Sequence, residues 1–183
     1  MAIMRYVIAA ALAASPAFAQ AGVRTLGSSD ARGCYLAAEL RRNVDMRDLV
    51  RCDDALRVGG LDIRDTAATH VNRGILRMRL GHIDAAIADF DAASAIDPGQ
   101  PEAYLNKGAA LIVRQQPGEA ARLFTVALER NTMRPELAHY GRAVAHETLG
   151  DARAAYADYR RASELAPRWR EPRADLTRFR VTR

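Results

Sequence analysis

The residues of this chain that could carry out chemistry are two cysteines and a few histidines and carboxylates. Cys34 and Cys52 are the only cysteines, and their spacing fits neither a C-x-x-C redox motif nor a zinc-finger pattern. His146-Glu147 begins like the H-E-x-x-H motif of zinc proteases, but the second histidine of that motif is missing. His139 and His146 would lie about 10.5 Å apart along a helix, too far to bind one zinc ion. We therefore predict no metal and no cofactor, and interpret both histidines as solvated or capping residues.

Other signatures of catalysis are absent from the sequence. It contains no G-x-S-x-G nucleophile motif, no glycine-rich phosphate loop and no calcium-binding loop. One segment is rich in carboxylates that fit the solvated face of a helix: Asp84, Asp89, Asp91 and Asp97. We expect a protein that is not an enzyme, with a scattered active site as a distant alternative.

The first 19 residues have the three zones of a secretory signal peptide. Arg5 precedes an apolar run over residues 6–14, and Ala17-Phe18-Ala19 fits an Ala-x-Ala cleavage site. The apolar run is shorter than the roughly 20 residues that cross a bilayer as a helix. We therefore predict cleavage before Gln20, a periplasmic location and a mature chain without a transmembrane segment. An uncleaved anchor is the alternative.

Export changes the interpretation of the two cysteines, because an oxidising compartment favours disulfides. Cys34 and Cys52 are 18 residues apart, and closing a loop of this size is worth roughly 3 kcal/mol in the chain-entropy model. We predict a structural disulfide between them. Redox or metal chemistry is the alternative.

The net charge of +5 is concentrated at the C-terminal end, where residues 153–183 contain nine arginines and four carboxylates. A basic chain suggests nucleic acid as a partner, but an exported protein meets little of it, so we expect none. Arginines spaced around a helix keep the end of a protein soluble. A solvated end is therefore the favoured interpretation, and binding of anionic envelope components stays open.

The chain has 183 residues and is 49% hydrophobic, which is enough apolar material for a folded core. The helices expected to position the residues above follow a repeated pattern. Segments 67–97, 101–131 and 136–166 each contain two helical stretches joined by a turn. The first stretch of each has a small residue near its middle: Gly74, Gly108 and Ala143. The second has a small, an aromatic and a small residue at offsets of four and three: Ala86, Phe90, Ala93; Ala120, Phe124, Ala127; Ala155, Tyr159, Ala162. These offsets place the three residues on one helical face, where the alanines let a neighbouring helix approach the ring.

The repeating unit, with aromatic residues 34 and 35 positions apart, resembles the tetratricopeptide repeat. The resemblance implies an all-α fold, a right-handed superhelical solenoid of helix-turn-helix repeats with a C-terminal cap helix. We expect residues 20–66 to form a degenerate helical hairpin with a linker, and residues 67–169 to form three repeats. Residues 170–183 would form the cap, because a repeat array needs a polar end.

The resemblance also implies a function, the binding of a protein or peptide on a concave face lined by the first helices. The candidate binding residues are Val71, Asn72, Ile75, Met78 and Arg79 in the first unit, Leu105, Asn106, Ala109, Ile112 and Val113 in the second, and Tyr140, Val144 and Glu147 in the third. Asn72 and Asn106 are 34 residues apart and should stack as a ladder that offers amide groups to an extended backbone. The aliphatic residues would take partner side chains or belong to the core between repeats.

These expectations describe a noncatalytic adaptor of the bacterial cell envelope. Some members of the family hold a chain-terminal carboxylate with a lysine-rich clamp, but Lys107 is the only lysine here, which disfavours that kind of partner. A self-associating structural module is the alternative function.

Overall fold

The computed structural model describes residues 22–24, 28–40 and 43–179, and every regular element in these ranges is a helix. The helices are α2 (Ser29–Leu40), α3 (Met46–Val58), α4 (Ile63–Arg79), α5 (Ile83–Ile96), α6 (Pro101–Val113), α7 (Pro117–Glu129), α8 (Pro135–Leu149), α9 (Ala152–Leu165) and the short α10 (Glu171–Leu176). None of the helices in these ranges is long and apolar enough to cross a membrane. The proposed signal peptide lies outside the described residues.

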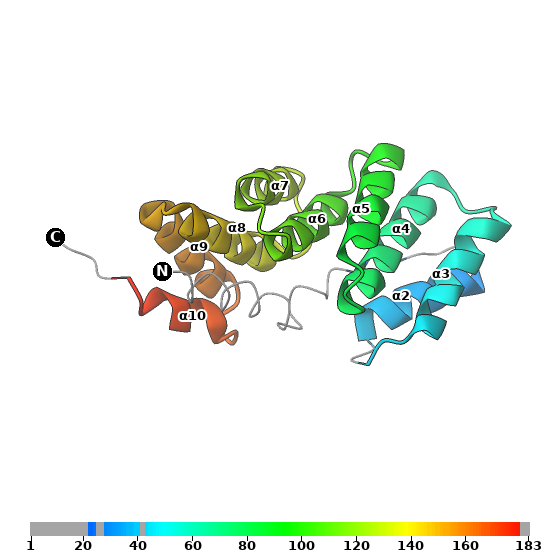
Figure 1. The fold of residues 1–183 in the computed structure, drawn as a ribbon, viewed down its shortest axis with the longest axis horizontal. Coiled ribbons are helices and arrows are strands. Elements are labelled where there is room, and N and C mark those ends of the chain that lie inside the picture. The colour runs from blue at the N-terminus through cyan, green and yellow to red at the C-terminus, as the bar shows by residue number, and fades with distance from the viewer. Residues whose placement is uncertain (1–21, 25–27, 41–42, 180–183) are drawn as a thin grey trace.

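The helices stack as consecutive antiparallel pairs into an elongated solenoid (Figure 1). The pair α2–α3 lies at one end, and α9 with α10 lies at the other (Figure 1). The first helices of the pairs, α2, α4, α6 and α8, contact one another in that order and so form one wall of the solenoid. The predicted all-α solenoid of helix pairs is therefore confirmed.

The aromatic residue of each second helix fills the space inside and between pairs. Phe90 and Phe124 are completely buried, and Tyr159 is 1% exposed. A Cβ atom on Gly74 would lie 2.5 Å from Cε1 of Phe90, and one on Gly108 would lie 3.0 Å from Cε1 of Phe124. The first helices therefore need glycine at these positions because a ring occupies the volume of the missing side chain.

A third glycine, Gly141, contacts the Phe124 ring from the following helix pair. A Cβ atom on Gly141 of α8 would overlap Cζ of Phe124. The sequence pattern pointed to Ala143 as the small residue of α8 and missed Gly141. Phe124 is thus held between glycines of α6 and α8, which joins the second tetratricopeptide-like pair to the third.

The turn inside each pair needs a residue with positive φ. Gly81 and Gly150 supply it with φ values of 81° and 85°, while the middle pair uses Gln115 at 60°. Glycine adopts this conformation without steric cost, whereas other residues rarely do. The middle turn is therefore the strained one of the three.

The first pair is held together by a disulfide between Cys34 of α2 and Cys52 of α3, whose Cα atoms are 4.9 Å apart. Both cysteines are completely buried. The first pair has no aromatic residue at the position that is aromatic in the later pairs. The buried disulfide takes the place of such a core side chain.

The chain after α9 folds back on the last pair. The Phe179 ring lies 5.9 Å from the rings of both Tyr156 and Tyr159, and Trp169 and Leu176 also pack against the core. The helical part of this segment, Glu171–Leu176, is shorter than the expected cap over residues 170–183, whose last four residues lie outside the described part of the chain.

Candidate functional site

Most of the residues expected to bind a partner are buried in the solenoid. At most 7% of the residue surface is exposed for Val71, Asn72, Ile75, Leu105, Asn106, Ala109, Ile112, Tyr140 and Val144. The aliphatic members of this set belong to one hydrophobic core, so they stabilise the stack of first helices. The partly exposed candidates are Met78, Arg79, Val113 and Glu147.

Asn72 binds a main-chain segment, and this segment belongs to the chain itself. Oδ1 of Asn72 accepts a hydrogen bond from the N–H of Val23 at 2.8 Å, and Nδ2 donates to the Val23 carbonyl at 2.7 Å. One side-chain amide can reach both groups of a residue only when they point to the same side, as they do in an extended strand. The amide of α4 therefore pairs with residues 22–24 as a neighbouring strand would.

The surroundings of this segment come from α2 and α4. A Cβ atom on Gly22 would lie 2.9 Å from Oε2 of Glu39 and 3.4 Å from Oδ1 of Asn72. The side chain of Val23 is partly buried against the hydrophobic core. Burial lowers the pKa of Arg79, and the nearby Glu39 carboxylate opposes that change. Residues 22–24, Glu39, Asn72 and Arg79 together are called the N-terminal site below.

Asn106 makes a different contact from Asn72. Its Nδ2 donates to the carbonyl of Glu102, four residues earlier in α6, at 2.8 Å. Glu102 is itself 5% exposed, and its Oε1 accepts hydrogen bonds from the Thr132 hydroxyl and the Met133 N–H. The two asparagines share a position in the repeat, but these contacts tie Asn106 to its own helix.

The polar candidates of the third unit hold the C-terminal segment. The Tyr140 hydroxyl donates to Oδ2 of Asp175 at 2.9 Å. Oε2 of Glu147 accepts from the Tyr159 hydroxyl and from Nη2 of Arg178, both at 2.7 Å. Burial, followed by these carboxylates, raises the pKa values of both tyrosines. This end of the wall is therefore occupied by residues 169–179.

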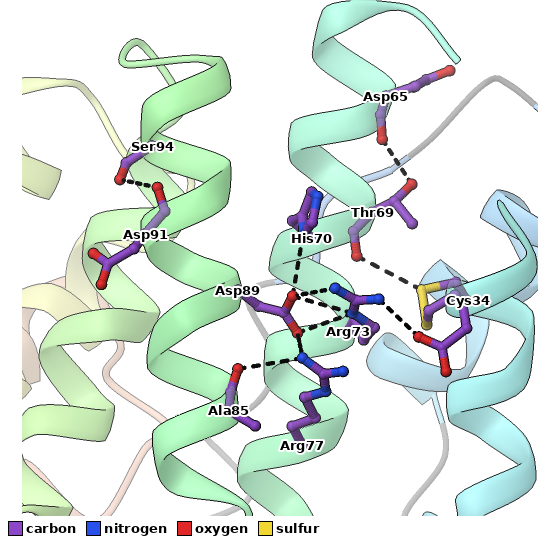
Figure 2. Close-up of polar contacts among 12 residues, drawn as sticks. Cys34, Asp65, Thr69, His70, Arg73, Arg77, Ala85, Asp89, Asp91 and Ser94 are labelled. Carbon is purple, nitrogen blue, oxygen red and sulfur yellow. Dashed lines mark hydrogen bonds and ion pairs between the residues drawn. A yellow bond between two sulfur atoms is a disulfide. The ribbon is translucent and has the colours of Figure 1, made fainter. Parts of the chain in front are cut away.

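Asp89 of α5 is at the centre of a buried ionic cluster, which corrects its interpretation as part of a solvated face. Its carboxylate is 2% exposed and accepts hydrogen bonds from Arg73 and Arg77 of α4 at 2.7 and 2.8 Å (Figure 2). Nδ1 of His70 lies 3.1 Å from Oδ1 of the same carboxylate. Burial alone would raise the pKa of Asp89, but the hydrogen bonds from His70 and Arg73 hold it below its ordinary value. Arg73 also pairs with Asp53 of α3 at 2.8 Å, which connects the cluster to the first pair.

The same cluster recurs in the last pair around Asp158 of α9. His139 and Arg142 of α8 each bind its carboxylate at 2.8 Å, and these bonds hold the pKa of Asp158 below its ordinary value against the effect of burial. His139 thus binds a buried carboxylate and is not a solvated or capping residue. The histidine-to-aspartate separation is 19 residues in both clusters, and this repeated spacing could have revealed the pairs in the sequence.

Each of these carboxylates joins the two helices of its pair, because it accepts hydrogen bonds from arginine and histidine side chains of the facing helix. Within the part of the chain that the structure describes, no three histidine, cysteine, aspartate or glutamate side chains form a group that could hold a metal ion.

Comparisons with known proteins agree with the repeat geometry. The sequence model of the family described as tetratricopeptide repeat matches residues 67–100 and 137–168, which coincide with the pairs α4–α5 and α8–α9. A solved structure described as the first TPR of Spaghetti (RPAP3) bound to the HSP90 peptide SRMEEVD is similar to this chain, with a TM-score of 0.60 and 23% sequence identity. The match covers 63% of this chain and 90% of that chain. No curated protein matches the sequence.

Proposed function

The chain is a tetratricopeptide-repeat protein, and from this premise we propose that it is a noncatalytic adaptor that binds a protein or peptide partner. The observation that carries the proposal is the pair of hydrogen bonds between Asn72 and the main chain of Val23. The wall of first helices contains a fixed amide that is already paired with a main-chain segment. A partner's main chain offers the same two groups.

We place this adaptor in the bacterial cell envelope. The support is the three-zone leader in residues 1–19 and the cysteine pair, which an oxidising compartment would keep joined. The noncatalytic part of the proposal is supported by Asp89 and Asp158, whose carboxylates are saturated by their ion-pair partners.

The test is affinity capture followed by titration. The immobilised mature chain is expected to retain a protein from an envelope extract that the Asn72→Ala variant releases, while an Asp91→Ala variant retains it. Asp91 is the matched control because its side chain is 54% exposed and lies on α5. The purified partner should then bind in a saturable titration. No retained protein would contradict the adaptor function, and equal retention by all three proteins would contradict the part assigned to Asn72.

A second candidate function, self-association, is favoured by apolar side chains on the first pair. The exposed fractions are 41% for Leu36, 70% for Leu40, 59% for Met46 and 53% for Val50. Such side chains on α2 and α3 would be covered if two copies met at this end. Sedimentation over a hundredfold range of concentration separates the candidates, because an adaptor keeps a constant mass and a self-associating module does not.

A further inference from the structure

We propose that the N-terminal site is a recognition site for an extended main-chain segment that carries an aliphatic residue, and that Gly22–Arg24 is its tethered ligand. An external segment of the same kind can bind Asn72 only when residues 22–24 leave. The structure shows residues 22–24 bound to Asn72. Only their competition with a partner rests on the proposed function.

The first step of the argument is main-chain recognition. An asparagine amide offers one acceptor and one donor group, and Asn72 uses them on the N–H and the carbonyl of Val23 at 2.8 and 2.7 Å. Asn72 is completely buried, so its amide is held in one position. Buried polar groups without partners are costly, and here the segment supplies a partner to both polar groups of the amide.

The second step is selection by size. The space beside Gly22 ends at Oε2 of Glu39, 2.9 Å from the position of a Cβ atom, and at Asn72 itself. A side chain there forces Glu39 to move. The next residue points to the core, where the side chain of Val23 packs. The flexible end of Glu39 can make this movement at little cost, so the site selects mainly for an aliphatic side chain at the position of Val23.

The third step is a free acceptor. Oε2 of Glu39 is buried, and no group in the described part of the chain donates a hydrogen bond to it. The charge of this carboxylate already interacts with Arg79 of the same site, so charge alone does not select the ligand. The free oxygen lies beside residue 22 and favours a segment that brings a hydrogen-bond donor to it.

The fourth step is the tether. A ligand joined to its site by a short linker acts at an effective concentration of about 1 mM. If the free segment binds with a dissociation constant of about 0.1 mM, the site is open in roughly one molecule in ten, and an external ligand binds about tenfold more weakly than to an empty site.

The test uses a fluorescent peptide with the sequence of residues 20–28, measured by anisotropy. We expect it to bind a Val23→Asp variant of the mature chain at least about tenfold more tightly than the unaltered mature chain, because an aspartate cannot pack where the Val23 side chain meets the core and so expels the tethered segment. An Asp91→Ala variant is the matched control, since the Asp91 side chain is 54% exposed on α5, and it should behave like the unaltered chain. A peptide with aspartate in place of its valine should bind none of the three. Equal binding of the original peptide to all three proteins, or to none, would overturn the proposal.

Hydrogen exchange at Val23 provides a measurement that needs no partner. The amide of residue 23 should be protected in the unaltered chain and in the Asp91→Ala variant, and unprotected in the Val23→Asp variant. Unprotected exchange at Val23 in the unaltered chain would overturn the tethered ligand. A protected Val23 together with a failed affinity capture would instead count against the adaptor function alone.

Discussion

Individual residues show where an interpretation from sequence fails in this protein. Asp84, Asp89 and Asp91 look alike as carboxylates of one helix, yet the Asp84 side chain is 86% exposed and that of Asp89 is 2% exposed. The difference comes from α4, which places two arginines opposite Asp89. Helical periodicity indicates which residues share a face, but the charge of the facing helix decides whether a carboxylate is buried.

Removal of the Asp89 carboxylate should be costly. We expect Asp89→Ala to lower the free energy of unfolding by about 3 kcal/mol, because it leaves two partly buried arginines without their buried partner. Asp91→Ala is the matched control on the same helix, and loss of its exposed pair with Lys107 should cost at most about 1 kcal/mol. Urea unfolding monitored by circular dichroism measures both. Equal losses would mean that the Asp89 cluster contributes no more than a surface pair.

The pH dependence of stability should follow from the same carboxylates. The pKa values of Asp89 and Asp158 are held below the ordinary value of 3.8 in the folded chain. Their contribution is therefore fully present above that value and is lost as the pH falls through the lower folded-state pKa values. Unfolding midpoints should decrease below about pH 4. An Asp89→Asn/Asp158→Asn variant should show a smaller decrease, and an unchanged slope would contradict this origin.

At the scale of helices, contacts between neighbouring pairs depend on glycines that accept an aromatic ring. Gly74 and Gly108 could be predicted because their positions repeat with the period of the chain. Gly141 could not, since it contacts Phe124 of the preceding pair. A repeat pattern describes the inside of one pair better than the contact between two pairs, where each junction has its own shape.

Gly141 is expected to be intolerant of even one extra carbon. Gly141→Ala should destabilise the protein by about 1 to 3 kcal/mol, since the new methyl group overlaps the Phe124 ring and the core must shift. In Gly118→Ala the added Cβ has no atom within 4 Å, and the helix propensity of alanine should leave stability unchanged or raise it by up to about 1 kcal/mol. Thermal unfolding of the two variants measures this difference in stability. A Gly141→Ala protein as stable as the Gly118→Ala protein would contradict the packing argument.

At the scale of the whole molecule, the repeated part was predictable and the two ends were not. The period of 34 residues is written in the sequence several times, so the stack of helix pairs follows from local patterns. The contacts of Val23 with Asn72 and of Asp175 with Tyr140 each occur once and join residues 49 and 35 positions apart. The period of the repeat does not predict such contacts. They determine which parts of the wall of first helices are covered by the ends of the chain.

The proposed export predicts the covalent state of the mature chain. Protein isolated from the periplasm should begin at Gln20 by mass spectrometry and should show no thiol that reacts with an alkylating agent before reduction. A Cys34→Ala/Cys52→Ala variant should lose roughly 3 kcal/mol of stability in the chain-entropy model, because the disulfide restricts the unfolded chain. Labelling of both cysteines in the unreduced protein would contradict the export argument and the covalent link together.

The C-terminal segment has a further consequence for assembly. Identical repeat proteins can join head to tail into open filaments when the last repeat of one copy accepts the first repeat of the next. Here Trp169, Leu176 and Phe179 pack against the last pair. They cover the surface that the first repeat of an incoming copy would contact. Head-to-tail growth of a filament would first require this segment to detach from the last pair.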